Sequence, residues 1–271
     1  RQKAVLRQQL QVDEIGVSGV GGKALIGGVP IAGGAEGQKL PVPLPGSVKE
    51  IRKFVGGAAH CADAVGGGQG KQGKQDSGGT FHGGTFPGRV NESNILEKDI
   101  NLDIALKLDQ LLEETGALVV MTRRTDTDLI PQESKEEKLL LQQRADLEQR
   151  IQIGAQSKAD YFISIHCNSI PNEKWSGAQT FYNPEDPESQ ALAQAIQQML
   201  IEQLGDHDRE ALPREDTYLF KNATMPTVIV ECGFLSNAEE AAKLQDPAYQ
   251  QQLAWAIYLG VNQYLAAQNP Q

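Results

Sequence analysis

Cysteine, histidine and aromatic residues are all scarce in this chain of 271 residues. The three cysteines, at positions 61, 167 and 232, show no Cys-x-x-Cys spacing, and their odd number leaves at least one unpaired. The sequence therefore indicates no disulfide framework, and we interpret Cys167 and Cys232 as small buried residues rather than reactive thiols. Four histidines are too few to favour a site with two metal ions.

Long apolar runs are also missing. No run reaches the roughly 18 residues of a transmembrane helix, and no secretory signal peptide is visible. The sequence therefore predicts no integral membrane segment. Because the first methionine is Met121, we expect the natural N-terminus to lie outside this sequence.

Positive charge is scarce in the larger part of the chain. Residues 92–271 hold 14 Lys and Arg against 29 Asp and Glu, whereas residues 1–91 hold 11 against 6. A body this acidic argues against nucleic acid as a partner and suits a neutral or weakly charged polymer.

Glycine is abundant, but 22 of the 28 glycines precede residue 92. Such a segment has no helical or strand period, and ordering it costs more entropy than its contacts return. We interpret residues 1–80 as an atypical segment: a linker, a disordered tail, or an aberrant sequence such as a frameshift produces. Within it, Ala4–Val12 and Val48–Val55 could each form a short helix or strand.

From Asn91 onward, apolar periodicity predicts alternating helices and strands. The expected helices are 97–112, 139–156, 188–204, 238–244 and 248–265, and the expected strands are 117–122, 161–166, 178–182 and 228–231. This alternation predicts an α/β fold, with a mostly parallel twisted sheet, helices on both faces, and one catalytic domain over residues 81–271.

Two apolar strands end in residues that can carry chemistry. Tyr161–Ile165 leads into His166, and Thr227–Val230 leads into Glu231. Open α/β sheets place their sites at the carboxyl ends of such strands, so a His and a Glu there indicate a metal-hydrolase site. A histidine in this position is also common as a hydrogen-bonded core residue.

Catalytic zinc takes three protein ligands and leaves one position for water. Glu97 opens a predicted helix, where a carboxylate could equally serve the helix dipole. His82 is followed by two glycines, which allow a sharp backbone turn that could point the ring into a cleft.

Several motifs occur in one order along the chain, and residues 92–266 resemble the zinc-dependent N-acetylmuramoyl-L-alanine amidases of the amidase 3 family. The matching stretches are Glu97–Leu102, Thr122–Arg124 with Asp126 and Asp128, Arg144 with Ala159-Asp160, Ser164–Ser169 and Glu231–Asn237. This resemblance implies hydrolysis of the amide between the muramic acid lactyl group and L-alanine in peptidoglycan. Trp175–Tyr182 further resembles the germination-specific, spore-cortex branch.

The resemblance implies a Zn²⁺ site formed by His82, Glu97 and His166, with Glu231 as the catalytic glutamate. His82 departs from the family pattern, because Gly79-Thr80-Phe81 replaces Asp-Pro-Gly and no apolar strand precedes it. Its spacing of 15 residues to Glu97 matches the family. His60 is a poorer alternative, and we expect His207 to be solvated.

Four residues are candidate substrate contacts: Asn168, Arg144, Trp175 and Asn237. Asparagine can bind substrate amides, but it also caps helices and forms turns. Trp175 could stack on a sugar or close the wall of the cleft. Arg144, like Arg123 and Arg124, could bind stem-peptide carboxylates, pair with Glu231, or belong to salt bridges of the scaffold.

The resemblance also implies peptidoglycan as the partner and action outside the cytoplasm, in the periplasm, cell wall or spore cortex. We expect a monomer. The alternative is a metal-poor, inactive amidase homologue that binds the cell wall, which the departure at His82 motivates. A zinc aminopeptidase or carboxypeptidase would need more Asp and His ligands than this chain contains.

Overall fold

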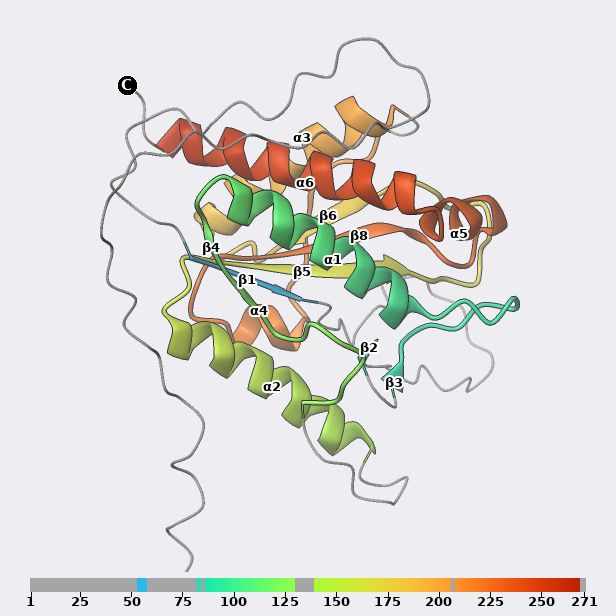
Figure 1. Ribbon diagram of the computed structural model, residues 1–271, viewed down its shortest axis with the longest axis horizontal. Coiled ribbons are helices and arrows are strands. Elements are labelled where there is room, and N and C mark those ends of the chain that lie inside the picture. Colours follow the sequence, from blue (N-terminus) through green and yellow to red (C-terminus); the bar gives the residue numbers. More distant parts are fainter. Residues whose placement is uncertain (1–52, 58–81, 84–85, 130–138, 206–207, 269–271) are drawn as a thin grey trace, which may run out of the picture. The chain divides into compact units, whose positions relative to one another are not determined.

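A six-stranded sheet forms the centre of the computed structural model, which describes residues 53–57, 82–83, 86–129, 139–205 and 208–268 (Figure 1). In spatial order, its strands are β4 (Leu118–Met121), β1 (Lys53–Gly57), β5 (Tyr161–Asn168), β8 (Thr227–Phe234), β6 (Gln179–Tyr182) and β7 (Leu212–Pro213). The pairs β4–β1, β1–β5 and β5–β8 are parallel, whereas β6 runs antiparallel to β8. The predicted mostly parallel sheet is therefore confirmed.

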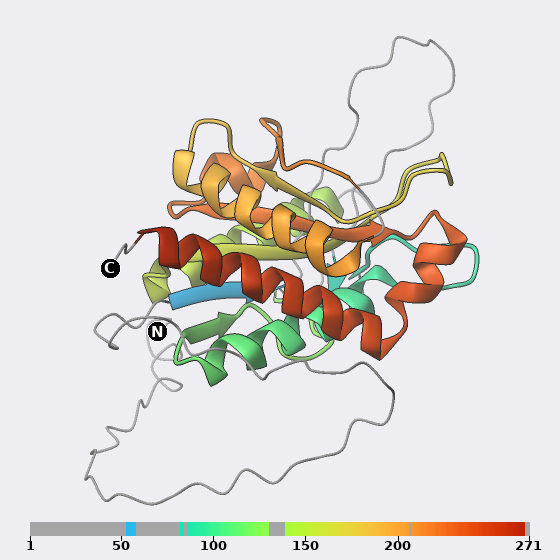
Figure 2. The same ribbon diagram turned by 90° about the horizontal axis from the view of Figure 1, so that it is seen from above.

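Helices cover both faces of this sheet, as predicted. One face carries α1 (Glu97–Glu114), α3 (Pro187–Leu204), α5 (Ala238–Leu244) and α6 (Pro247–Gln268), which Figure 2 shows from above. The other face carries α2 (Leu139–Ser157) and α4 (Tyr218–Asn222). Among the described helices, none is long and apolar enough to cross a membrane.

Alternation along β5 separates the two cores. Ile163 and Ile165 pack in the cluster beneath α1, α3 and α6, whereas Phe162 packs with residues of α2 and α4. Because side chains alternate along a strand, His166 leaves the sheet on the same side as Phe162. The same alternation places Glu231 of β8 on the side of Ile229. The two polar residues therefore share one face at the carboxyl ends of neighbouring strands.

Most predicted elements occur within two residues of their expected ends, and four short ones were not predicted: β2 (His82–Gly83), β3 (Phe86–Pro87), β7 and α4. Both β7 and α4 lie between α3 and β8. They contain only 2 and 5 residues, too few to show a period. On α1, Leu112 is buried in the core and Leu111 is partly buried against it.

Strand β1 comes from the segment before residue 80. It lies between β4 and β5, and the described residues all belong to a compact unit, Val42–Gln271. The structural unit therefore includes residues on the N-terminal side of the expected domain boundary. Only Phe54 and Val55 are strongly apolar there before two glycines follow, so the sequence pattern is too short to identify a central strand. Most of residues 1–80 lies outside the described structure.

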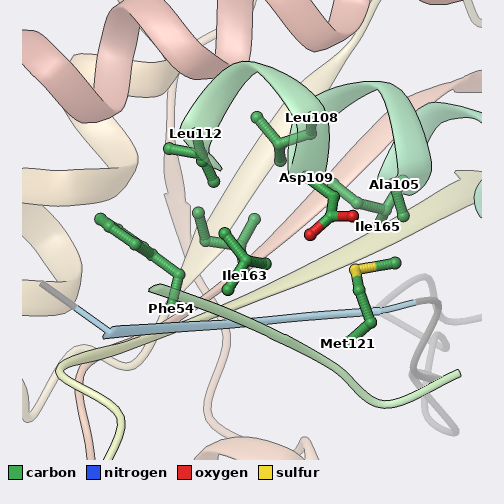
Figure 3. Close-up of a pocket in the computed structure, with 9 residues that line it drawn as sticks. Phe54, Ala105, Leu108, Asp109, Leu112, Met121, Ile163 and Ile165 are labelled. Carbon is green, nitrogen blue, oxygen red and sulfur yellow. The ribbon is translucent and has the colours of Figure 1, made fainter. Parts of the chain in front are cut away.

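A small apolar cavity lies between α1 and strands β1, β4 and β5 (Figure 3). Gly56 pairs with Met121 and Ile163 and, two residues after Phe54, occupies the same face of β1. A glycine contributes no side chain to this face of the strand. The one carboxylate in its lining, Asp109, accepts hydrogen bonds from Arg124 at 2.6 and 3.2 Å.

Candidate active site

Glu97 and His166 meet where α1 begins and β5 ends. His166 Nδ1 lies 3.3 Å from Glu97 Oε1, and each side chain is only 2% exposed. Glu97 is therefore not a solvated first-turn carboxylate, although it does open α1.

Neighbouring groups orient both side chains. Glu97 Oε1 accepts hydrogen bonds from the Cys167 backbone N–H at 3.0 Å and from Asn101 Nδ2 at 3.1 Å. Its Oε2 accepts from the Arg89 backbone N–H at 3.0 Å. On the far side of the ring, His166 Nε2 lies 3.0 Å from Ser164 Oγ. These contacts hold Nδ1 toward the carboxylate.

The start of α1 is itself tied to the loop after β4. Arg123 Nη2 donates to the Lys98 carbonyl at 2.6 Å, and Lys98 Nζ pairs with Asp126 at 2.6 Å. Both contacts involve the residue next to Glu97. The motif at Thr122–Arg124 and Asp126 thus helps to place Glu97 at the end of β5.

Glu231 completes the cluster on β8. Its backbone pairs with that of His166, its side chain is buried, and its Oε2 has no hydrogen-bond partner among the described residues. Burial raises the pKa of Glu231 to about 7, the positive charge of Arg214 opposes the rise, and the Glu97 carboxylate adds to it. A carboxylate of this kind can accept and release a proton near neutral pH.

Among the described residues, the cation paired with Glu231 is Arg214, whose Nη1 lies 3.9 Å from Glu231 Oε1. Its guanidinium stacks at 3.7 Å on the Phe181 ring, and its backbone N–H donates to the Tyr182 carbonyl. No sequence pattern identifies this residue, because it follows a strand of only two residues.

The three arginines that were considered as partners of Glu231 make other contacts. Arg123 and Arg124 bind the Lys98 carbonyl and Asp109, and Arg144 lies on α2 with its guanidinium 4.7 Å from the Tyr218 ring centroid. The first two thus take the scaffold role that was left open.

The other candidate substrate contacts occupy loops at the carboxyl edge. Trp175 is 48% exposed. Asn237 caps α5, accepting from the backbone of Glu239 and Glu240, and its amide donates to the Glu173 and Trp175 carbonyls. Asn168 lies partly buried at the end of β5, where its carbonyl accepts from Leu235. Their substrate roles, like that of Arg144, stay predictions.

His82 lies in β2 (His82–Gly83), which pairs with β3 (Phe86–Pro87) in a two-stranded ribbon that contacts α1. Its side chain, like His60 and His207, lies outside the described part of the structure. Within that part, no three His, Cys, Asp or Glu side chains converge as a metal site.

Cys167 and Cys232 are both buried and unpaired. Burial is the main reason that the pKa of each thiol rises well above its usual range. Their interpretation as small buried residues is confirmed.

Known proteins resemble this chain in sequence over most of the part that contains the site. Residues 80–263 match Amidase_3, described as N-acetylmuramoyl-L-alanine amidase. The germination-specific N-acetylmuramoyl-L-alanine amidase of Bacillus subtilis is 42% identical over 183 residues, which cover 68% of this chain and 76% of that protein. N-acetylmuramoyl-L-alanine amidase LytC of the same organism is 33% identical, but the match covers only 34% of its length.

A solved structure shows the same fold. The CwlD amidase of Clostridioides difficile, determined in complex with the GerS lipoprotein, superposes with a TM-score of 0.68 at 37% identity. The superposition covers 80% of this chain and 99% of CwlD. With the family match extending over most of the chain, the protein belongs to the Amidase_3 family of N-acetylmuramoyl-L-alanine amidases.

Proposed function

We propose that this enzyme is a zinc-dependent amidase that hydrolyses the bond between the muramic acid lactyl carbonyl and the L-alanine nitrogen of peptidoglycan. The observation that carries the proposal is the meeting of Glu97, His166 and Glu231 at the carboxyl ends of β5 and β8. Family membership supports the same reaction.

The donors in this cluster fit zinc. Two ligands of a tetrahedral zinc ion, each about 2.0–2.1 Å from the metal, lie about 3.3–3.4 Å apart. His166 Nδ1 and Glu97 Oε1 are 3.3 Å apart. Ser164 on the second ring nitrogen provides the outer contact that metal-binding histidines usually make. We assign His82 as the third ligand, from its family-like spacing to Glu97.

Zinc, when bound, supplies a Lewis acid that polarises the substrate carbonyl and makes water more acidic. Glu231 takes a proton from the attacking water and then delivers it to the nitrogen of L-alanine as the C–N bond breaks. Its Oε2, which has no hydrogen-bond partner among the described residues, is available to take that proton. Arg214 limits the rise in the pKa of Glu231, which keeps a fraction of the carboxylate ionised at neutral pH.

The test combines metal analysis with cleavage of purified peptidoglycan. The wild-type protein should contain about one zinc per chain and release new L-alanine amino groups. The Glu231→Gln variant should retain the zinc and lose cleavage by a factor of at least about 100. Unchanged turnover in that variant would refute the role of Glu231. Peptidoglycan binding without zinc or cleavage in the wild type would instead establish the inactive, wall-binding alternative.

We infer action outside the cytoplasmic membrane, where peptidoglycan lies. Similarity to a germination-specific amidase makes spore-cortex peptidoglycan the substrate to test first. A lipoprotein partner like that of CwlD is a second point to test by co-purification.

A further inference from the structure

Three side chains from separate segments form a stack beside the catalytic cluster. The Arg209 guanidinium lies 5.3 Å from the Trp175 ring centroid and 4.8 Å from the Phe234 ring centroid. Phe234 is 2% exposed, whereas Trp175 is 48% exposed. The arginine is thus anchored on a buried ring and covered by an accessible one, a contact that favours a fixed planar cation.

Among the described residues, hydrogen bonds use only some of the N–H groups of Arg209. Its Nε donates to the Ser176 carbonyl and its Nη1 donates to Gln179 Oε1 at 2.8 Å. These bonds use two of the five N–H groups of a guanidinium, and Arg209 is partly exposed. N–H groups therefore remain for a ligand.

The nearby carboxylate of Glu240 is already engaged by the backbone. Its two oxygens accept hydrogen bonds from the N–H groups of Gly177 and Phe234, both at 2.7 Å. Burial lowers the pKa of Arg209, while Glu240 and Asp208 oppose that change. A guanidinium keeps its charge at neutral pH in such surroundings.

The stack borders Glu231 through Gln179 and through β8. Gln179 lies directly opposite Glu231 in the antiparallel β6–β8 pair, where such residues have Cα atoms about 4.5–5.5 Å apart. Phe234 ends the same strand that carries Glu231. A substrate group held by Arg209 would therefore lie one side chain away from the catalytic carboxylate.

We propose that Arg209, fixed by Trp175 and Phe234, binds a carboxylate of the peptide stem on the alanine side of the scissile amide. This inference rests on the proposed function. The stem peptide carries carboxylates, whereas the N-acetyl sugars are neutral, so a planar cation selects the peptide side. Arginine binds carboxylates through paired charge-assisted hydrogen bonds. A protein of net charge −10 needs such a local cation to hold an anionic substrate.

The test compares Arg209→Gln with the wild type on two versions of one ligand. The probe is a stem peptide that begins with L-alanine, prepared with free carboxylates and with all carboxylates amidated. Titration calorimetry measures binding without any need for cleavage. We expect Arg209→Gln to weaken binding of the free-carboxylate peptide by about 10- to 100-fold. Binding of the amidated peptide should change by less than about twofold.

A kinetic measurement separates this role from a structural one. On peptidoglycan fragments with free carboxylates, Arg209→Gln should raise KM by a similar factor and leave kcat nearly unchanged. The Arg209→Lys variant keeps the charge but not the planar guanidinium, so its KM should lie between those of the wild type and Arg209→Gln. Lys221→Gln removes an exposed cation from α4 and serves as the matched control. Its affinity for the free-carboxylate and the amidated peptide should equal that of the wild type.

Equal losses of affinity for the two peptides would overturn the inference, because they would mean that Arg209 only supports the loops. Absence of binding by either peptide to the wild type would overturn it as well. Failure of the wild type to cleave peptidoglycan, with the difference in peptide binding intact, would count against the proposed function alone.

Discussion

Glu231 carries its carboxylate in surroundings that disfavour charge. It is 6% exposed, one of its oxygens has no hydrogen-bond partner among the described residues, and the Arg214 guanidinium is 3.9 Å away. Glu97 is 2% exposed, but among the described residues it accepts hydrogen bonds from Asn101 and from the backbone N–H groups of Arg89 and Cys167. These environments suit a proton carrier and a fixed ligand, respectively.

The raised pKa of Glu231 predicts that the metal-free wild type and the Glu231→Gln variant differ in how their stability depends on pH. The pKa of Glu231 is about 7 in the folded state, above the roughly 4.3 of an unfolded glutamate. Folding therefore favours the protonated form. Its stabilising contribution is complete below the unfolded pKa and is lost as the pH rises through the folded pKa. The Glu231→Gln variant has no titrating group at this position, so its stability does not fall in this way as the pH rises.

Urea unfolding of the metal-free wild type and Glu231→Gln from pH 4 to pH 8.5 measures the effect. The variant should gain stability relative to the wild type between about pH 4.5 and 7, by an amount on the order of 3 kcal/mol, and the gain should level off above that range. Stability curves that stay parallel across the range would contradict the assignment.

The proposed third metal ligand, His82, can be tested by substitution. Replacement of a ligand should remove most of the zinc, so His82→Ala should contain less than about a tenth of the wild-type amount. His60→Ala is the matched control and should retain it. Elemental analysis after dialysis distinguishes the two histidines, and the reverse result would transfer the assignment to His60.

Helices α3 and α6 approach each other closely at Gly260. A Cβ placed there would lie 2.4 Å from the Ile196 Cα and 2.8 Å from the Ala195 carbonyl oxygen. Both are backbone atoms, so the clash is relieved only if the two helices separate. Since α6 covers the strands that carry His166 and Glu231, this contact matters for the sheet beneath the site.

We expect Gly260→Ala to lower the free energy of unfolding by about 2–3 kcal/mol. Gly154→Ala on α2 is the matched control, because its nearest contact is the flexible Met225 side chain, at 3.2 Å. The gain in helix propensity, up to about 1 kcal/mol, should offset that contact. Chemical denaturation measures both variants, and similar losses for the two would contradict the proposed close approach.

For the whole molecule, zinc would couple the sheet to α1. Its proposed ligands come from α1, β5 and the β2–β3 ribbon, which are distant in sequence. A ligand that binds only the folded state stabilises that state by mass action.

Removal of zinc with a chelator should therefore lower the melting temperature. The free energy of unfolding should fall by about 4 kcal/mol if free zinc had been present at about 1,000 times its Kd. Adding zinc back should restore the transition in the wild type and have little effect on His166→Ala. Scanning calorimetry measures both, and an equal response in the two proteins would show that zinc acts elsewhere.

Local patterns in the sequence were sufficient to predict the long helices, the two apolar strands and the alternation that produces a parallel sheet. Motif order then indicated His166, Glu97 and Glu231 as candidate site residues, because each follows or opens a strongly periodic element. These features depend on neighbouring residues, which the sequence displays directly.

Other features depend on residues far apart in the chain, and only the tertiary structure decided them. Strand β1 is too short to have a pattern of its own, yet it pairs with strands on both sides. Arg214 and Arg209 lie in an irregular segment and acquire their roles from Glu231, Phe181, Trp175 and Phe234. Burial set the high pKa of Glu231, and burial exists only after the layers have packed together.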